Sequence, residues 1–147
     1  SVGLSPKAHS IEVERIGINL KQMPCDEREW LFPHRVDSDG PFFRLSSIDT
    51  REVVLDLREM GIPAQQSFST GMYICNAVLY KTLGYIEDHD LSKKAGFIHV
   101  PLLISQDPNG MELETMIDAI EVSINSSLDE ISIKHDICCE IYPYSKI

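Results

Sequence analysis

Hydrophobic and polar residues alternate in several short stretches of the chain, a pattern that predicts β-strands. Residues 11–19 alternate isoleucine or valine with glutamate before the alternation shifts phase. A two-residue period of this kind is typical of a strand with one charged face. Residues 64–68 resemble a second short strand. The apolar run 95–100 ends at Pro101, which suits a buried strand.

Three other stretches have apolar residues at the spacing of an amphipathic helix: residues 50–60, 73–85 and 112–123. Asp49 or Thr50 caps the first of these helices, and Gly61 ends it. Strands and helices therefore alternate along the chain. This order predicts an α/β fold with a mainly parallel sheet.

Two regions carry weaker patterns. Residues 20–45 contain three prolines among charged residues, so we expect a long irregular surface excursion. The end of the chain is expected to contain one more strand, either around residues 131–133 or around residues 137–141.

Length and composition limit the class of protein. A chain of 147 residues with 43% apolar and 24% charged residues suits one globular domain, which we place at residues 1–147. The net charge of −10, with no cluster of basic residues, argues against nucleic acid as a partner. No stretch approaches the roughly 20 apolar residues that cross a bilayer, so we expect no membrane partner.

The four cysteines are spaced neither as a zinc site nor as a secreted disulfide framework: Cys25, Cys75, Cys138 and Cys139. A reducing cytoplasm is therefore the expected compartment. His135 and Asp136 lie beside the Cys138–Cys139 pair, but the strand-like isoleucines around them favour packing over metal binding. We expect no metal site.

Cys75 is the first candidate for chemistry, because it follows a Ser-Thr-Gly turn where a helix is predicted to begin. The partial positive charge and free N–H groups at a helix N-terminus favour a thiolate, which is a nucleophile. The same N–H groups could bind the oxyanion formed when a thiolate attacks a carbonyl. The alternative is that Cys75 is a small buried residue, as unpaired cysteines often are.

His99 and Glu14 could complete a catalytic set with this thiol. His99 lies near the end of a predicted strand, where it could accept a proton from the thiol, or it could be a structural histidine. Glu14 lies in an apolar strand, where a carboxylate needs a partner. It could hold the imidazole in one tautomer, or it could pair with Arg15 or Lys7.

Three segments together resemble the pyroglutamyl peptidase I family of cysteine peptidases, also called pyrrolidone-carboxylate peptidases. Residues 3–19 resemble the family's glutamate signature, residues 67–76 its cysteine signature, and residues 95–101 its histidine segment. The likeness spans about residues 3–120, and the order and separations of the segments also fit. Three signatures in the right order make the resemblance specific.

The resemblance implies a three-layer α/β/α sandwich with a catalytic triad of Cys75, His99 and Glu14. It implies removal of N-terminal pyroglutamate from peptides through a thioester, without a metal or organic cofactor. Tyr73 and Ile74 would line the pocket for the lactam ring, whose flat uncharged shape favours apolar walls. Family members form dimers or tetramers, so we expect a homo-oligomer.

The sequence departs from the family pattern in several places. It begins after the family's usual N-terminal segment, so we expect a shortened domain whose sheet exposes an apolar edge and face. Glu12 stands where a Ser or Thr is usual, and Gly17 where an Ala is usual. Two alternatives therefore stay open: a non-catalytic member of the same fold that acts as an interaction protein, and an unrelated small acidic interaction domain.

Overall fold

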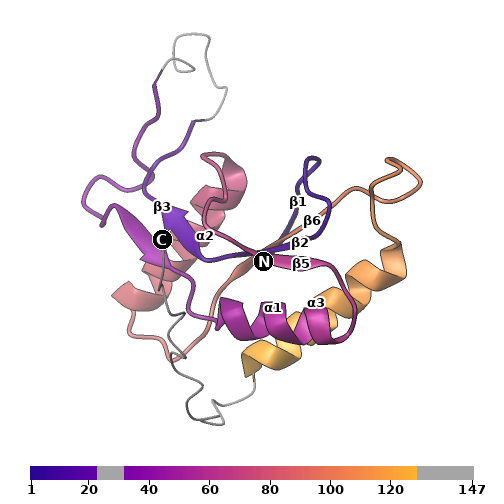
Figure 1. Ribbon diagram of the computed structural model, residues 1–147. Coiled ribbons are helices and arrows are strands. Elements are labelled where there is room, and N and C mark those ends of the chain that lie inside the picture. The colour runs from indigo at the N-terminus through magenta and orange to yellow at the C-terminus, as the bar shows by residue number, and fades with distance from the viewer. Residues whose placement is uncertain (23–31, 129–147) are drawn as a thin grey trace, which may run out of the picture.

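The computed structural model describes residues 1–22 and 32–128 of the chain. Its central sheet has four short strands in the order β1-β6-β2-β5 (Figure 1). The strands are β1 (Val2–Leu4), β6 (Phe97–Val100), β2 (Ile11–Glu14) and β5 (Ala64–Ser67). The tail strand predicted after residue 130, and Cys25, Cys138 and Cys139, lie outside the described residues.

Helices cover both faces of this sheet, as predicted for a three-layer α/β/α sandwich (Figure 1). Helices α1 (Thr50–Glu59) and α3 (Leu113–Leu128) pack together against one face, and α2 (Ile74–Asp88) lies on the other. The three helices correspond to the predicted ones, although α2 and α3 end several residues later than the periodicity indicates. Asp49 caps α1, because its carboxylate accepts hydrogen bonds from the backbone N–H groups of Arg51 and Glu52.

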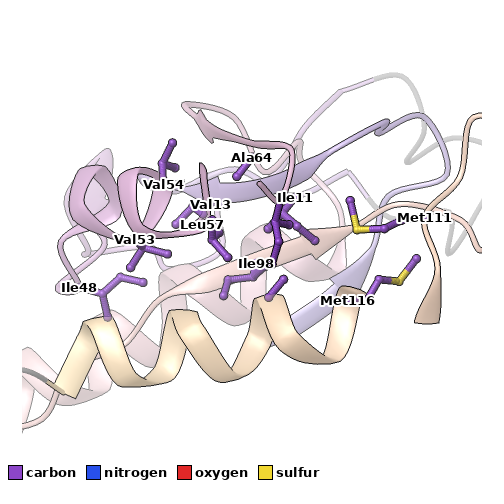
Figure 2. Packing of buried hydrophobic residues seen from close by; sticks show 12 residues of the cluster. Ile11, Val13, Ile48, Val53, Val54, Leu57, Ala64, Ile98, Met111 and Met116 are labelled. Carbon is purple, nitrogen blue, oxygen red and sulfur yellow. The ribbon is translucent and has the colours of Figure 1, made fainter. Parts of the chain in front are cut away.

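The main hydrophobic core lies between the sheet and the α1–α3 layer (Figure 2). Ile11 and Val13 project from β2 into this core and are fully buried. Because side chains alternate along a strand, Glu12 and Glu14 project to the opposite face, beneath α2. The alternation seen in the sequence therefore separates a packed face from a polar one.

The sheet is mainly parallel, but its central pair is not. Strands β1 and β6 run parallel, and so do β2 and β5, whereas β2 and β6 are antiparallel. Periodicity describes one strand at a time and carries no information on the direction of its neighbour. The antiparallel pair matters because it sets Glu12 opposite His99 and Glu14 opposite Phe97.

The region predicted as an irregular excursion contains a strand that the periodicity did not reveal. β4 (Phe43–Leu45) pairs antiparallel with β3 (Ile16–Ile18) to form a separate two-stranded sheet. The expected strand 11–19 is thus divided at Arg15 into β2 and β3, which join different sheets. The phase shift in the sequence marks this change of sheet.

A buried amide ties β3 to the start of α2. The Asn76 side chain is fully buried, accepts a hydrogen bond from the Ile18 N–H at 2.8 Å, and donates to the carbonyls of Ile18 and Leu20 at 2.9 and 2.8 Å. These bonds use both the carbonyl and the amino group of the side chain. They fix the helix turn that carries Cys75 against the neighbouring strand.

We expect Asn76→Ala to lower the free energy of unfolding by about 2–4 kcal/mol, because it leaves one buried N–H and two carbonyls unpaired. Asn125→Ala, at an exposed position of α3, is the matched control and should change stability by less than about 0.5 kcal/mol. Urea unfolding followed by circular dichroism measures both. Equal midpoints for the two variants would contradict this role of Asn76.

The first strand, β1, carries exposed apolar side chains. Val2 and Leu4 are 51% and 53% exposed, although both are large aliphatic residues in a strand. Ile98, Ile120 and Ile124 lie near this strand around a cavity of about 670 Å³. Within residues 1–22 and 32–128, no helix has the length and apolar character needed to cross a bilayer.

Candidate active site

The predicted site residues meet on the face of the sheet that α2 covers. Glu12, Glu14 and His99 project from β2 and β6 toward this face, and Gly3 of β1 pairs with His99 on its other side. Cys75 is the second residue of α2, whose first turn lies above. Elements far apart in sequence thus bring three polar groups and a thiol together.

Glu14 and His99 form a buried hydrogen-bonded pair. The Nδ1 atom of His99 lies 2.7 Å from Oε1 of Glu14, and the two residues are only 7% and 1% exposed. Arg15, a possible alternative partner for Glu14, instead donates to the carbonyl of Ser46. A carboxylate in this position holds Nδ1 protonated and leaves Nε2 free to accept a proton.

Glu14 reaches the imidazole diagonally across the two strands. The residue directly opposite Glu14 is Phe97, whose ring centroid lies 5.0 Å from that of His99. The Thr70 hydroxyl lies 3.4 Å from the second carboxylate oxygen of Glu14 and donates to the Ile16 carbonyl at 3.0 Å. Phe97 and Thr70 therefore support the two ends of the carboxylate–imidazole pair. Sequence reasoning did not identify either residue.

The Cys75 thiol lies one strand away from this pair. A Cβ atom built on Gly3 would be 3.1 Å from Sγ of Cys75 and 2.9 Å from the Phe97 ring. Gly3 is the partner of His99 in the β1–β6 pair. Because Gly3 has no side chain, the thiol can approach the sheet next to β6, the strand that carries His99. Gly3 lies in the glutamate signature, but its role depends on strand register, which the sequence alone does not show.

Burial raises the pKa of the Cys75 thiol above its ordinary value. The backbone N–H of Cys75 at the start of α2 opposes this increase, and the negative charge of Glu14 adds to it. The helix N-terminus by itself is therefore not enough to lower the pKa of this thiol, because desolvation acts against it more strongly. Formation of the thiolate therefore depends on a group that accepts its proton.

This balance predicts the pH dependence of thiol alkylation. In His99→Ala, we expect the rate of Cys75 modification by iodoacetamide to rise only at alkaline pH, since its raised pKa leaves the neutral thiol dominant near pH 7. If His99 accepts the thiol proton, the wild-type chain should react faster than this variant at neutral pH. Peptide mass spectrometry after timed alkylation measures the rate at Cys75. Identical pH profiles for the two proteins would show that His99 does not accept the thiol proton.

The residues predicted to line a lactam pocket flank the thiol. Tyr73 is the N-cap of α2 and Ile74 its first residue, and they are 50% and 54% exposed. Phe68, which follows β5, is a further exposed aromatic residue, at 62%. The apolar surface next to Cys75 is thus accessible, whereas the Glu14–His99 pair beneath it is not.

A cation could in principle approach the three polar side chains. One potential ligand atom from each of Glu12, Glu14 and His99 lies within 4.8 Å of the others. The Glu14–His99 hydrogen bond already joins two of these groups, and a metal ion bound through Nδ1 would have to replace it. A cation and the Glu14–His99 hydrogen bond would therefore compete for the same side chains.

The α/β/α fold thus brings Cys75, His99 and Glu14 to one face of the sheet, the residue types that cysteine hydrolases use. The pyroglutamyl peptidase family model matches residues 1–130, and the chain belongs to this family. The pyrrolidone-carboxylate peptidases of Thermococcus litoralis and Pyrococcus furiosus are 34% and 31% identical to it over 141 residues. Each alignment covers 88% of this chain, and they cover 64% and 68% of the two relatives.

Solved structures agree with the sequence relatives. The pyrrolidone carboxyl peptidase of Thermococcus litoralis superimposes with a TM-score of 0.79 and 35% identity, over 87% of this chain and 64% of that one. The family and the α/β fold predicted from the sequence are thus confirmed. The chain spans about two thirds of the length of the relatives that it matches.

Proposed function

We propose that this protein is a cysteine peptidase that removes N-terminal pyroglutamate from peptides, and that Cys75, His99 and Glu14 form its catalytic triad. The main support is the buried 2.7 Å contact between His99 and Glu14 beneath the helix turn that carries Cys75. The names of the relatives, pyrrolidone-carboxylate peptidases, supply the substrate class. We further propose that residues 1–147 form a single domain.

The proposed reaction has two stages. His99 takes the proton of the Cys75 thiol, and the sulfur attacks the carbonyl carbon that joins pyroglutamate to the next residue. His99 then gives this proton to the leaving amine as the C–N bond breaks, which leaves a thioester on Cys75. Water, deprotonated by His99, attacks the thioester, and the departing sulfur regains the proton. Glu14 stabilises the imidazolium that forms in each stage.

The position of Cys75 in α2 also suits the negative charge that develops on the carbonyl oxygen. The first N–H groups of a helix have no partner within the helix and point out of its end. The N-cap residue of α2, Tyr73, makes no capping hydrogen bond to them with its side chain. These donors could bind the oxyanion of the tetrahedral intermediate.

We propose that Tyr73 and Ile74 form walls for the lactam ring. Their exposed apolar surfaces adjoin the thiol. Pyroglutamate has no free amine and no charge, so a pocket with apolar walls would admit it with a smaller desolvation cost than a charged N-terminus.

The test is hydrolysis of a pyroglutamyl amide that releases a fluorophore. We expect release from the pyroglutamyl compound and none from the matched glutaminyl compound, which has an open chain and a charged amine. A folded protein that cleaves neither compound would support the alternative, a non-catalytic family member that acts as an interaction protein.

The cellular context belongs to the same proposal. The spacing of the cysteines supports a cytoplasmic location, because it differs from the spacing in secreted disulfide frameworks. The exposed apolar side chains of Val2 and Leu4 support a homo-oligomer, either a dimer or a tetramer. Light scattering coupled to size-exclusion chromatography would show a monomer mass if that proposal is wrong.

A further inference from the structure

We propose that Glu12 is a second carboxylate acting on the catalytic imidazole, a positioning residue that sets the pH range in which the Cys75–His99 pair works. The inference rests on the proposed function, because it assigns His99 a proton-transfer role. It adds a residue outside the triad, and its basis is the register of β2 against β6.

The backbone of Glu12 lies directly opposite that of His99 in the sheet, whereas the backbone of Glu14 does not. Glu12 and His99 are direct partners across the antiparallel β2–β6 pair, whereas Glu14 is the diagonal neighbour. A carboxylate oxygen of Glu12 lies within 4.8 Å of a His99 ring nitrogen and of a Glu14 oxygen. The imidazole therefore faces two carboxylates, one hydrogen-bonded to it and one at its side.

Glu12 is held in this position from the other side. Its partner on β5 is Gln65, whose Nε2 donates a hydrogen bond to Oε1 of Glu12 at 3.1 Å. Glu12 is partly exposed, whereas Glu14 is almost fully buried. Salt in the solvent can therefore screen Glu12 more than Glu14.

The other groups around His99 give it little further charge. β2 contributes Glu12 and Glu14, and α2 contributes the Cys75 thiol. The neighbouring strands add no titratable group here: Gly3 of β1 is the partner of His99, and Gln65 and Ser67 of β5 are the partners of Glu12 and Glu14. Lys7 and His9 lie on the loop between β1 and β2, and both are solvent-exposed.

A negative charge at Glu12 makes every loss of a proton from the Cys75–His99 pair harder. This holds whichever of the two groups carries the proton, because a nearby negative charge favours the protonated form of either one. Glu12 therefore moves both limbs of the bell-shaped kcat/KM profile to higher pH. It also stabilises the imidazolium that forms during proton transfer.

The test is the pH profile of kcat/KM for the pyroglutamyl amide in wild type and Glu12→Gln, which keeps the side-chain shape and removes the charge. We expect both limbs to move to lower pH by about 0.5–1 unit in low salt. In about 1 M NaCl the difference should shrink, since Glu12 is partly exposed. Glu12→Asp, which keeps the charge, should stay close to wild type.

Glu59→Gln is the matched control, because it removes one exposed carboxylate from α1 on the opposite face of the sheet. Its profile should coincide with that of wild type. A Glu12→Gln profile that also coincides with wild type would overturn the proposal. If Glu12→Gln fails to fold by circular dichroism, Glu12→Ser is measured in its place against the same criteria.

NMR titration of the His99 imidazole separates this proposal from the proposed function. The signal, assigned with His99→Gln, should titrate at lower pH in Glu12→Gln than in wild type even if the protein cleaves no pyroglutamyl amide. Absence of hydrolysis would therefore count against the proposed function alone. Superimposed NMR titrations would refute the role of Glu12.

Discussion

Cys75→Ser is expected to lower kcat/KM for a pyroglutamyl amide by at least about 10⁴-fold while leaving the fold unchanged. A hydroxyl is a far weaker acid than a thiol, so the same imidazole cannot generate a useful nucleophile from it. Cys75 is partly buried, and serine differs from it by one atom, so stability should change little. Fluorophore release gives the rate, and circular dichroism verifies the fold.

Cys25→Ser is the control, because it removes a thiol from a segment with no predicted catalytic role. It should retain wild-type activity. Iodoacetamide should inactivate wild type and Cys25→Ser alike, with the label found at Cys75. Substantial activity in Cys75→Ser, free of wild-type contamination, would exclude the thioester mechanism.

The sequence predicts the helices of this fold better than its sheet. Each of the three helices has an apolar stripe that repeats every three to four residues, a signal contained within one segment. β1 spans only Val2–Leu4 and β4 only Phe43–Leu45, lengths too short for a recognisable alternation. Their existence depends on pairing with β6 and β3, which lie far away in the sequence.

In the candidate site, too, the sequence shows what lies within one segment but not how distant segments pack together. The family signatures identify Cys75, His99 and Glu14, and the structure brings the last two into contact. They do not show that burial raises the pKa of the Cys75 thiol, because desolvation depends on what packs around the sulfur. Nor do they show that Gly3 lies beneath the thiol, because that follows from strand register.

The antiparallel β2–β6 pair explains how one imidazole comes to face two glutamates. Residues two apart on β2 project to the same face, so a carboxylate at either Glu12 or Glu14 points toward α2. His99 lies opposite the first and within diagonal reach of the second. In the proposed reaction the buried Glu14 orients the imidazole ring, while the partly exposed Glu12 shifts the pH at which the ring is protonated.

Glu14→Gln is expected to lower kcat/KM by about 10²–10⁴-fold, because the neutral amide neither stabilises the imidazolium nor fixes Nδ1 as the protonated nitrogen. An amide NH₂ that faces Nδ1 favours the tautomer with its proton on Nε2, which cannot accept the thiol proton. The free energy of unfolding should change far less than activity does, since glutamine fills the same volume without a buried charge. Enzyme assays and urea unfolding on one preparation compare the two effects.

Glu121→Gln, at an exposed position of α3, controls for the loss of one negative charge and should behave as wild type. Glu14→Ala should lose at least as much activity as Glu14→Gln, and it should also be less stable, since it leaves Nδ1 of His99 unpaired in a buried site. Near-wild-type activity in Glu14→Gln would mean that the carboxylate charge contributes little to proton transfer. The 2.7 Å contact would then serve chiefly to hold the β2–β6 pair together, and Glu12 would be the carboxylate that matters for the imidazole.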